Sequence, residues 1–215
     1  MSADENPSRT VAVTGAGSGI GRAIAEAFAE QGDTVFVCDI SEQRVGEVAD
    51  AIDAPARGSV VDVSDNEQIS GFLRSAHERT GRLDVLVSAA GIFDGYAGVI
   101  ETSPELWRKV LDVNLTGCFL GTKVASELMI SQGSGRIISI GSIATFRGGA
   151  DGIAYTAAKA GMHGMTRRLA FDVGRHGVTA NMICPGVIPS GIRANSEEVL
   201  GELSPDTVGS GSLRS

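Results

Sequence analysis

The feature that most constrains this chain is a glycine-rich segment, Thr14–Gly21, between an expected strand and an expected helix. Half of its residues are glycine: Gly15, Gly17, Gly19 and Gly21. Glycine removes side chains where a backbone must approach something closely. A helix N-terminus also presents free N–H groups and a positive dipole to an anion. The segment therefore predicts a phosphate-binding loop, because the alternative, a plain turn, rarely needs four glycines.

The spacing of the glycines narrows the kind of phosphate site. Gly15, Gly19 and Gly21 follow the pattern G-x-x-x-G-x-G, and the pattern G-x-G-x-x-G does not fit. The segment also lacks the Gly-Lys-Ser/Thr ending of a triphosphate-binding loop, which argues against triphosphate hydrolysis.

Length and composition exclude several classes of protein. The 215 residues suit one α/β domain. The net charge of −8 argues against nucleic acid and anionic membranes as partners, because both prefer basic patches. Cys38, Cys118 and Cys184 are widely spaced in apolar runs, so we expect core thiols in a reducing compartment, with no disulfide and no metal site. The N-terminus resembles no signal peptide and no apolar run suits a membrane span, so we expect a cytoplasmic protein.

Six Val/Ile-rich runs predict strands, and helical patterns separate them. The runs lack clean alternation, which is typical of strands buried on both faces. This order predicts an α/β fold with a doubly wound, Rossmann-type parallel sheet in three layers, α/β/α. The runs are Val11–Thr14, Val35–Asp39, Gly58–Asp62, Val85–Ser88, Arg136–Ile140 and Val178–Ile183.

Two of the helices carry clear end signals. Ser64 and Glu67 match a capping box, and Gly81 is a suitable end for the helix that follows. Ser103 before Pro104 predicts the start of the next helix.

Asp39 ends the second expected strand, about 20 residues past the glycine loop. Ligands of open parallel sheets bind beyond the carboxyl ends of the strands, where a carboxylate can accept a hydrogen bond from a ribose 2′-OH. The same carboxylate repels a 2′-phosphate, so Asp39 predicts a preference for NAD over NADP. The alternative is an aspartate that caps a turn or helix.

Tyr155 and Lys159 stand four residues apart at the start of an expected helix and so share one face of it. An ammonium about 4 Å from a phenol stabilises the phenolate by up to roughly 4 kcal/mol, which would lower the tyrosine pKa by nearly three units. That change would bring the phenol into the range for proton transfer. Ser142 follows a strand on the ligand side of the sheet, where its hydroxyl could polarise a carbonyl. The alternatives are an exposed helix pair and a strand-end serine.

Together these residues resemble the short-chain dehydrogenase/reductase family, from about Thr10 to Arg193. Each match is weak alone, but the order and spacing are highly specific. The resemblance implies an NAD-dependent enzyme that transfers a hydride between NAD(H) and a secondary alcohol or ketone. The matching elements are Thr14–Gly21, Asp62 with Val63, Asn114, Ser142, Tyr155 with Lys159, and Pro185 with Gly186.

The resemblance also implies a role for each matching residue. Tyr155 would be the acid/base, Ser142 would orient the substrate oxygen, and Lys159 would hold the nicotinamide ribose and lower the pKa of Tyr155. Asn114 would kink its helix and anchor a proton-relay water, although a buried, satisfied amide is an equal alternative. The other implied cofactor contacts are Gly15, Ser18, Gly19, Ile20 and Gly21 for the pyrophosphate, Asp62 and Val63 for the adenine, Ala90 and Gly91 for the ribose, and Ile188, after Pro185 and Gly186, for the carboxamide.

The chain departs from the family pattern in three places. Ser88–Gly91 reads Ser-Ala-Ala-Gly instead of Asn-Asn-Ala-Gly, so an amide that ties neighbouring strands together is missing, and Ser190 replaces a threonine. After Arg193 the family continues into two helices and a last parallel strand. Here we expect a polar arm (1–9), the domain (10–193), and a partial substrate helix with a flexible tail (194–215), with the last strand missing.

The expected partners are a small alcohol or ketone and a second copy of the chain. The family pattern implies a dimer through the long helices near residues 103–131 and 155–175. Phe93, Tyr96, Phe146 and Ile192 are expected to face the pocket, which suggests an apolar or cyclic ketone, and core packing is a nearly equal alternative. The alternative function is a non-catalytic or degenerate NAD-binding protein of the same fold.

Overall fold

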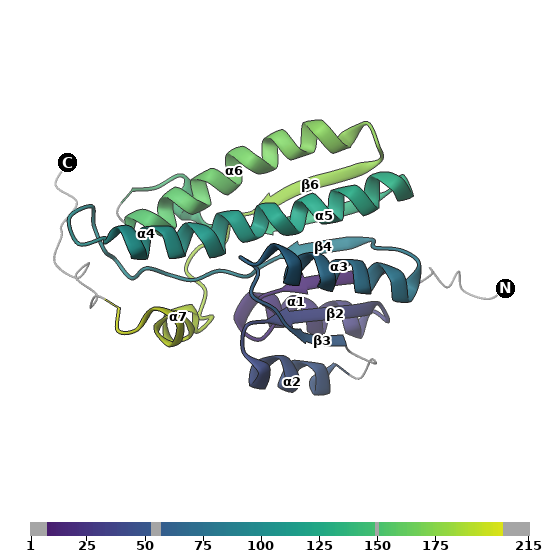
Figure 1. Ribbon diagram of the computed structural model, residues 1–215, viewed down its shortest axis with the longest axis horizontal. Helices are drawn as coiled ribbons and strands as arrows, with labels where there is room; N and C mark the ends of the chain where they lie inside the picture. Colours follow the sequence, from purple (N-terminus) through teal and green to yellow (C-terminus); the bar gives the residue numbers. More distant parts are fainter. Residues whose placement is uncertain (1–7, 53–56, 149–150, 204–215) are drawn as a thin grey trace.

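The centre of the molecule is one parallel sheet of six strands in the order β3-β2-β1-β4-β5-β6 (Figure 1). The structure is a computed structural model that describes residues 8–52, 57–148 and 151–203. All five strand pairs are parallel, which confirms the predicted Rossmann-type sheet. The strands are β1 (Thr10–Thr14), β2 (Thr34–Asp39), β3 (Arg57–Val60), β4 (Val85–Ser88), β5 (Gly135–Ile140) and β6 (Val178–Ile183).

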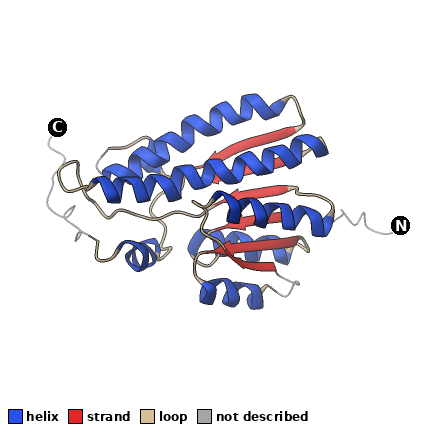
Figure 2. Ribbon diagram, viewed as in Figure 1, coloured by secondary structure: helices blue, strands red, loops and turns tan. Residues whose placement is uncertain are grey.

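Helices pack on both faces of this sheet and complete the three predicted layers (Figure 2). Helices α1 and α2 cover one face, over β1, β2 and β3, whereas α3, α5 and α6 cover the other face. The helices are α1 (Gly19–Glu30), α2 (Glu42–Ala51), α3 (Asn66–Thr80), α4 (Pro104–Leu111), α5 (Gly117–Gln132), α6 (Ile153–Gly174) and α7 (Ile192–Leu200).

The central strands are buried on both faces, as their apolar runs predict. Along β1, Ala12 packs into the core beneath α3 and α5, while Val11 and Val13 pack into the core beneath α1 and α2. Strand β6 differs, because Val178 and Ala180 are buried while Thr179, Asn181 and Ile183 are exposed. Among the described residues, β6 therefore forms one edge of the sheet and is covered on one face.

Several predicted boundaries differ from the structure. Strands β1, β2, β3 and β5 each begin one residue before the predicted run, and α7 begins at Ile192 rather than after Arg193. The cap of α3 is Asp65 rather than Ser64, since Asp65 Oδ1 accepts hydrogen bonds from the N–H groups of Glu67 and Gln68. Ser64 instead donates its hydroxyl to Asp62. Strand β3 ends at Val60, because the chain turns at Asp62 toward α3.

The other end signals are confirmed. Gly81 ends α3 with a left-handed φ of 76°, and the Ser103 hydroxyl oxygen accepts a hydrogen bond from the Leu106 N–H at the start of α4. Of the described helices, none is long and apolar enough to cross a membrane. Residues 1–7 of the predicted arm and 204–215 of the predicted tail lie outside the described residues.

Candidate active site

The glycine loop joins β1 to α1, and its glycines make room for neighbouring backbone. A Cβ on Gly15 would lie 2.5 Å from Ala90 Cα, and one on Gly19 would lie 2.7 Å from the Ser190 carbonyl oxygen. Both glycines have positive φ, 63° and 51°. The N-cap residue Ser18 makes no side-chain bond to the helix, and the first turn holds no acidic residue. The N-terminus of α1 is therefore open to an anion, as a cofactor pyrophosphate requires.

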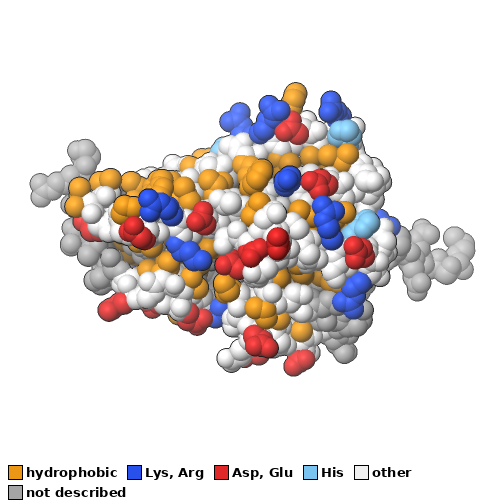
Figure 3. All heavy atoms as spheres, in the orientation of Figure 1, with side chains coloured by type: hydrophobic (Ala, Val, Ile, Leu, Met, Phe, Trp, Pro, Cys, Tyr) orange, Lys and Arg blue, Asp and Glu red, His pale blue; other side chains and the backbone are white. Residues whose placement is uncertain are grey.

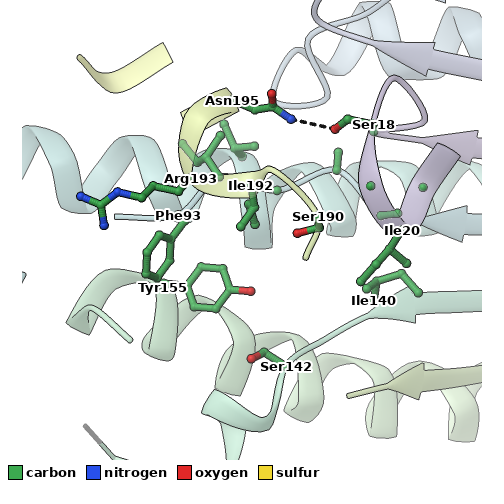
Figure 4. A pocket seen from close by; sticks show the side chains of 18 of the residues that line it. Ser18, Ile20, Phe93, Ile140, Ser142, Tyr155, Ser190, Ile192, Arg193 and Asn195 are labelled. Atoms are coloured by element: carbon green, nitrogen blue, oxygen red, sulfur yellow. Dashed lines mark hydrogen bonds between the residues drawn. The ribbon is translucent and has the colours of Figure 1, made fainter. Parts of the chain in front are cut away.

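A cavity of about 380 Å³ runs past this loop along the carboxyl ends of the strands (Figure 4). We call its two ends the Asp39 end and the Tyr155 end. Every predicted cofactor residue and three of the four predicted catalytic residues line it. They are Gly15, Ser18, Gly19, Ile20, Gly21, Asp39, Asp62, Val63, Ala90, Gly91, Ser142, Tyr155, Lys159, Pro185, Gly186 and Ile188.

Three of the four residues expected to face the substrate also line the cavity: Phe93, Tyr96 and Ile192. Phe146 does not line it. Its side chain is 64% exposed and packs edge-on against His163, with ring centroids 5.3 Å apart. The hydrophobic character of Phe146 therefore reflects a surface contact outside the cavity.

At the Asp39 end, the carboxylate is held by backbone and by an arginine. Asp39 Oδ2 accepts a hydrogen bond from the Gly17 N–H (3.1 Å), and Oδ1 accepts one from the Ser41 N–H (3.0 Å). Arg44 Nη2 lies 3.4 Å from Oδ1. Arg44 was missed in the sequence, although its place five residues after Asp39, in the first turn of the next helix, was a usable signal.

At the Tyr155 end, the three side chains predicted to meet do lie together. The Tyr155 phenol and the Ser142 hydroxyl point toward the same part of the cavity (Figure 4). Lys159 Nζ lies 5.4 Å from the centre of the Tyr155 ring and donates a hydrogen bond to the Ile140 carbonyl oxygen (2.8 Å). Phe93 supports the tyrosine ring edge-on, with centroids 5.5 Å apart.

The protonation of Tyr155 differs from the sequence expectation. Burial, followed by the charge of Asp151, raises the pKa of Tyr155 to about 12, while the Ser142 hydroxyl lowers that pKa. Burial also lowers the pKa of Lys159 to about 8. The expected lowering of the Tyr155 pKa is therefore wrong for this structure, in which the pKa is raised. At neutral pH the phenol is protonated and can act as a proton donor.

Two acidic residues beside Tyr155 were not singled out in the sequence. Asp94 is 1% exposed, and its Oδ2 accepts a hydrogen bond from the Tyr155 N–H (3.0 Å) in the first turn of α6. Gly152, the N-cap residue of α6, has no side chain, and a Cβ there would overlap the Asp94 carboxylate. Asp94 thus caps the helix that carries Tyr155 and Lys159. Asp151 lines the cavity itself.

Asn114 lies outside the cavity, in a π-helical turn between α4 and α5 (Asp112–Thr116). Its side chain is fully buried. Its Oδ1 accepts a hydrogen bond from the Ile92 N–H (2.7 Å), and its Nδ2 donates one to the Ile92 carbonyl oxygen (2.8 Å). The side chain is therefore a satisfied amide that ties the π turn to the segment after β4. A Cβ on Gly91 would lie 3.1 Å from Asn114 Oδ1.

The missing amide of the Ser88–Gly91 segment has a local substitute. Thr14 Oγ1, at the end of β1, accepts hydrogen bonds from the N–H groups of Ala89 (3.2 Å) and Ala90 (3.3 Å), just after β4. The hydroxyl of Thr14 therefore connects the two neighbouring strands beneath the cavity.

Comparison with known proteins agrees with this geometry. The family model described as short chain dehydrogenase matches residues 9–200. The chain is 38% identical over 184 residues to "(2S)-[(R)-hydroxy(phenyl)methyl]succinyl-CoA dehydrogenase subunit BbsD" of Thauera aromatica, covering 84% of this chain and 73% of that protein. It is 36% identical over 204 residues to levodione reductase of Leifsonia aquatica, covering 92% of this chain and 76% of that protein.

Solved structures give the same result. A crystal structure of levodione reductase matches with a TM-score of 0.84 and 34% identity, covering 90% of this chain and 78% of that one. The chain belongs to the short-chain dehydrogenase family, whose members are oxidoreductases that use a nicotinamide cofactor, NAD or NADP.

Proposed function

We propose that the protein transfers a hydride between NAD(H) and a secondary alcohol or ketone, with Tyr155 as the acid/base. The observation that carries this proposal is the meeting of Ser142, Tyr155 and Lys159 at one end of a cavity whose other end holds the glycine loop and Asp39.

The residues present fit a dinucleotide cofactor. At the glycine positions of the loop, a Cβ would overlap neighbouring atoms, so only glycine allows this close backbone packing. The open N-terminus of α1 suits a pyrophosphate. Asp39 suits the adenosine ribose of NAD and repels the 2′-phosphate of NADP. When bound, the nicotinamide supplies or accepts the hydride. Asp62, Val63, Ala90, Gly91 and Ile188 are the further residues proposed to hold the cofactor.

The chain's own residues supply the proton. In the direction of ketone reduction, the protonated Tyr155 gives its phenol proton to the substrate oxygen, while Ser142 orients that oxygen. In alcohol oxidation the same phenol, deprotonated, accepts the proton. Lys159 holds the cofactor ribose and places a cation near the phenolate, which favours that form. Asn114 acts from outside the cavity by fixing the segment that follows β4.

The apolar wall beside Tyr155 supports an apolar or cyclic ketone as substrate. Phe93 and Tyr96 pack edge-on with centroids 5.3 Å apart, and both line the cavity with Ile192. Secondary alcohols of this kind should be screened with NAD and with NADP, following the reduced cofactor by absorbance. Turnover with NAD supports the proposal. Tight NAD binding without any turnover would support the alternative of a non-catalytic cofactor-binding protein.

We also propose a homodimer through the long helices. Hydrophobic side chains are exposed on the face formed by α4, α5 and α6 (Figure 3). On these helices, Phe119 of α5 is 49% exposed and Phe171 of α6 is 80% exposed. Apolar side chains this exposed favour a protein interface. Phe171→Asp should convert the dimer to a monomer in light scattering, and an unchanged mass would contradict this interface.

A further inference from the structure

Arg44 connects the Asp39 end of the cavity to the last described helix. Its Nη2 lies 3.4 Å from Asp39 Oδ1, and its Nη1 lies 2.6 Å from Glu198 Oε2 on α7. The guanidinium therefore stands between two carboxylates from β2 and α7, far apart in the sequence. Arg44 lines the cavity and its side chain is 18% exposed, whereas the Glu198 side chain is 60% exposed.

A guanidinium in this place is the group that a 2′-phosphate would attract. Arginine is always charged and binds phosphate through paired N–H donors. Here both terminal nitrogens of Arg44 are engaged by carboxylates, while its Nε is buried and has no hydrogen-bond partner among the described residues. The donors that would recognise NADP are thus present in the cavity wall but are largely occupied.

We propose that Glu198 is a specificity-determining residue, which keeps the cofactor site selective for NAD by occupying the guanidinium of Arg44. The inference rests on the proposed NAD preference and extends it, because discrimination then depends on Asp39, Arg44 and Glu198 together. Loss of the Glu198 charge weakens the acceptor bound to Nη1, so that a phosphate oxygen can compete for this donor, and also lowers the negative charge near it.

Helix α7 has other contacts that hold it in place without Glu198. Asn195 Nδ2 donates to Ser18 Oγ at 2.8 Å, as Figure 4 shows, and the fully buried Ser196 accepts from the Phe93 N–H at 2.8 Å. A Glu198→Gln variant should therefore keep α7 docked over the glycine loop. The variant tests the charge of Glu198 separately from the position of the helix.

Glu197 offers a matched control on the same helix. Its side chain is 38% exposed and pairs with Arg193 at 3.4 Å. Glu197→Gln removes the same charge from α7 but leaves the Arg44–Glu198 pair intact. A general change of net charge would act in both variants, whereas release of Arg44 acts only in Glu198→Gln.

The experiment is calorimetric titration of NAD and NADP into the unmodified chain and the two variants. Glu198→Gln should improve NADP affinity relative to NAD about tenfold, the order expected for one gained charge-assisted hydrogen bond. Glu197→Gln should keep the ratio within about twofold. An unchanged ratio in Glu198→Gln, or an equal change in both variants, overturns the inference while the proposed function stands. A chain that binds neither cofactor contradicts the proposed function itself, and the inference with it.

A double-mutant cycle tests whether Glu198 acts through Arg44. In an Arg44→Gln background, Glu198→Gln should change the NADP-to-NAD ratio by less than about twofold, because the guanidinium is absent. An undiminished tenfold change there would show that Glu198 acts by direct repulsion, and would overturn the route through Arg44. If Arg44→Gln melts far below the unmodified chain, Arg44→Met serves as the background, because it removes the charge and all donors but keeps an unbranched side chain of similar length.

Discussion

The two ends of the cavity use charge in different ways. At the Asp39 end, the guanidinium of Arg44 pairs with the carboxylates of Asp39 and Glu198, and the Glu198 side chain is exposed to solvent. At the Tyr155 end, Tyr155, Lys159 and Asp94 are buried, and burial shifts the pKa of each. Because Glu198 is largely exposed, its charge interacts weakly with its surroundings, so the Asp39 end can change its charge pairing and select between ligands. Buried groups set which atom carries a proton.

This difference predicts that variants at the two ends fail in different measurements. A change at the Tyr155 end should alter turnover and its pH dependence, whereas a change at the Asp39 end should alter the choice of cofactor. A variant that changed turnover and cofactor preference equally would contradict this difference between the two ends.

The largest effect is expected for Tyr155→Phe, which removes only the phenol oxygen. Turnover should fall by about 10²- to 10⁴-fold, the usual contribution of general acid–base catalysis, while NAD affinity stays close to its original value. Steady-state kinetics measure turnover, and calorimetric titration measures NAD affinity. Tyr96→Phe is the control, because this second tyrosine lines the same cavity. Near-normal turnover in Tyr155→Phe would remove Tyr155 from its proposed role.

Lys159→Ala should damage binding and turnover together. Lys159 is buried and is hydrogen-bonded to the Ile140 carbonyl beneath the cavity. Loss of one charge-assisted hydrogen bond should lower kcat/KM about a hundredfold. Removing a cation also raises the pKa of Tyr155, so the rising limb of alcohol oxidation should move to higher pH. A limb that moves to lower pH would contradict this electrostatic role.

The strands and the glycine loop could be predicted because their signals are local. Each Val/Ile run marks one strand, and the glycines at positions 15, 19 and 21 are required by backbone contacts within the loop or with its neighbours. Helix starts are local as well, but adjacent polar residues compete for the same free N–H groups. Asp65 therefore caps α3 in place of Ser64, whose hydroxyl binds Asp62.

The contacts that tune the site could not be predicted in the same way. Asp94 caps α6 from 61 residues away, and Glu198 pairs with Arg44 from 154 residues away. Such pairs follow from how loops and α7 pack over the sheet, and one sequence contains no periodic signal for them. The pKa of Tyr155 was expected to fall because Lys159 stands four residues later in the sequence. The burial of Tyr155 and the nearby charge of Asp151 both follow from the tertiary structure and have no such local signal.

At the Asp39 end, Asp39→Ala should narrow the preference for NAD over NADP. Like charges placed side by side disfavour binding by several kcal/mol, so removing the carboxylate should shift the ratio of the two Kd values by roughly a hundredfold. Calorimetric titration of both cofactors measures the ratio. Equal affinity for NAD and NADP in the unmodified chain would show that Asp39 does not select the cofactor.

The smallest effect is expected for Asp151→Asn, which tests whether a charge at the buried end reaches the phenol. The Asp151 carboxylate raises the pKa of Tyr155, so its removal should lower that pKa. Alcohol oxidation needs the deprotonated phenol, and the rising limb of kcat/KM should therefore move to lower pH, by up to about one unit. Asp172→Asn is the control, because Asp172 pairs with Arg168 near the C-terminal end of α6, the helix that carries Tyr155. This variant should leave the rising limb of kcat/KM in place. The limb of the kcat/KM profile could instead stay fixed in Asp151→Asn, or move equally in both variants. Either result would mean that solvent screens charges at the Tyr155 end as it screens Glu198, and would contradict the contrast between the two ends.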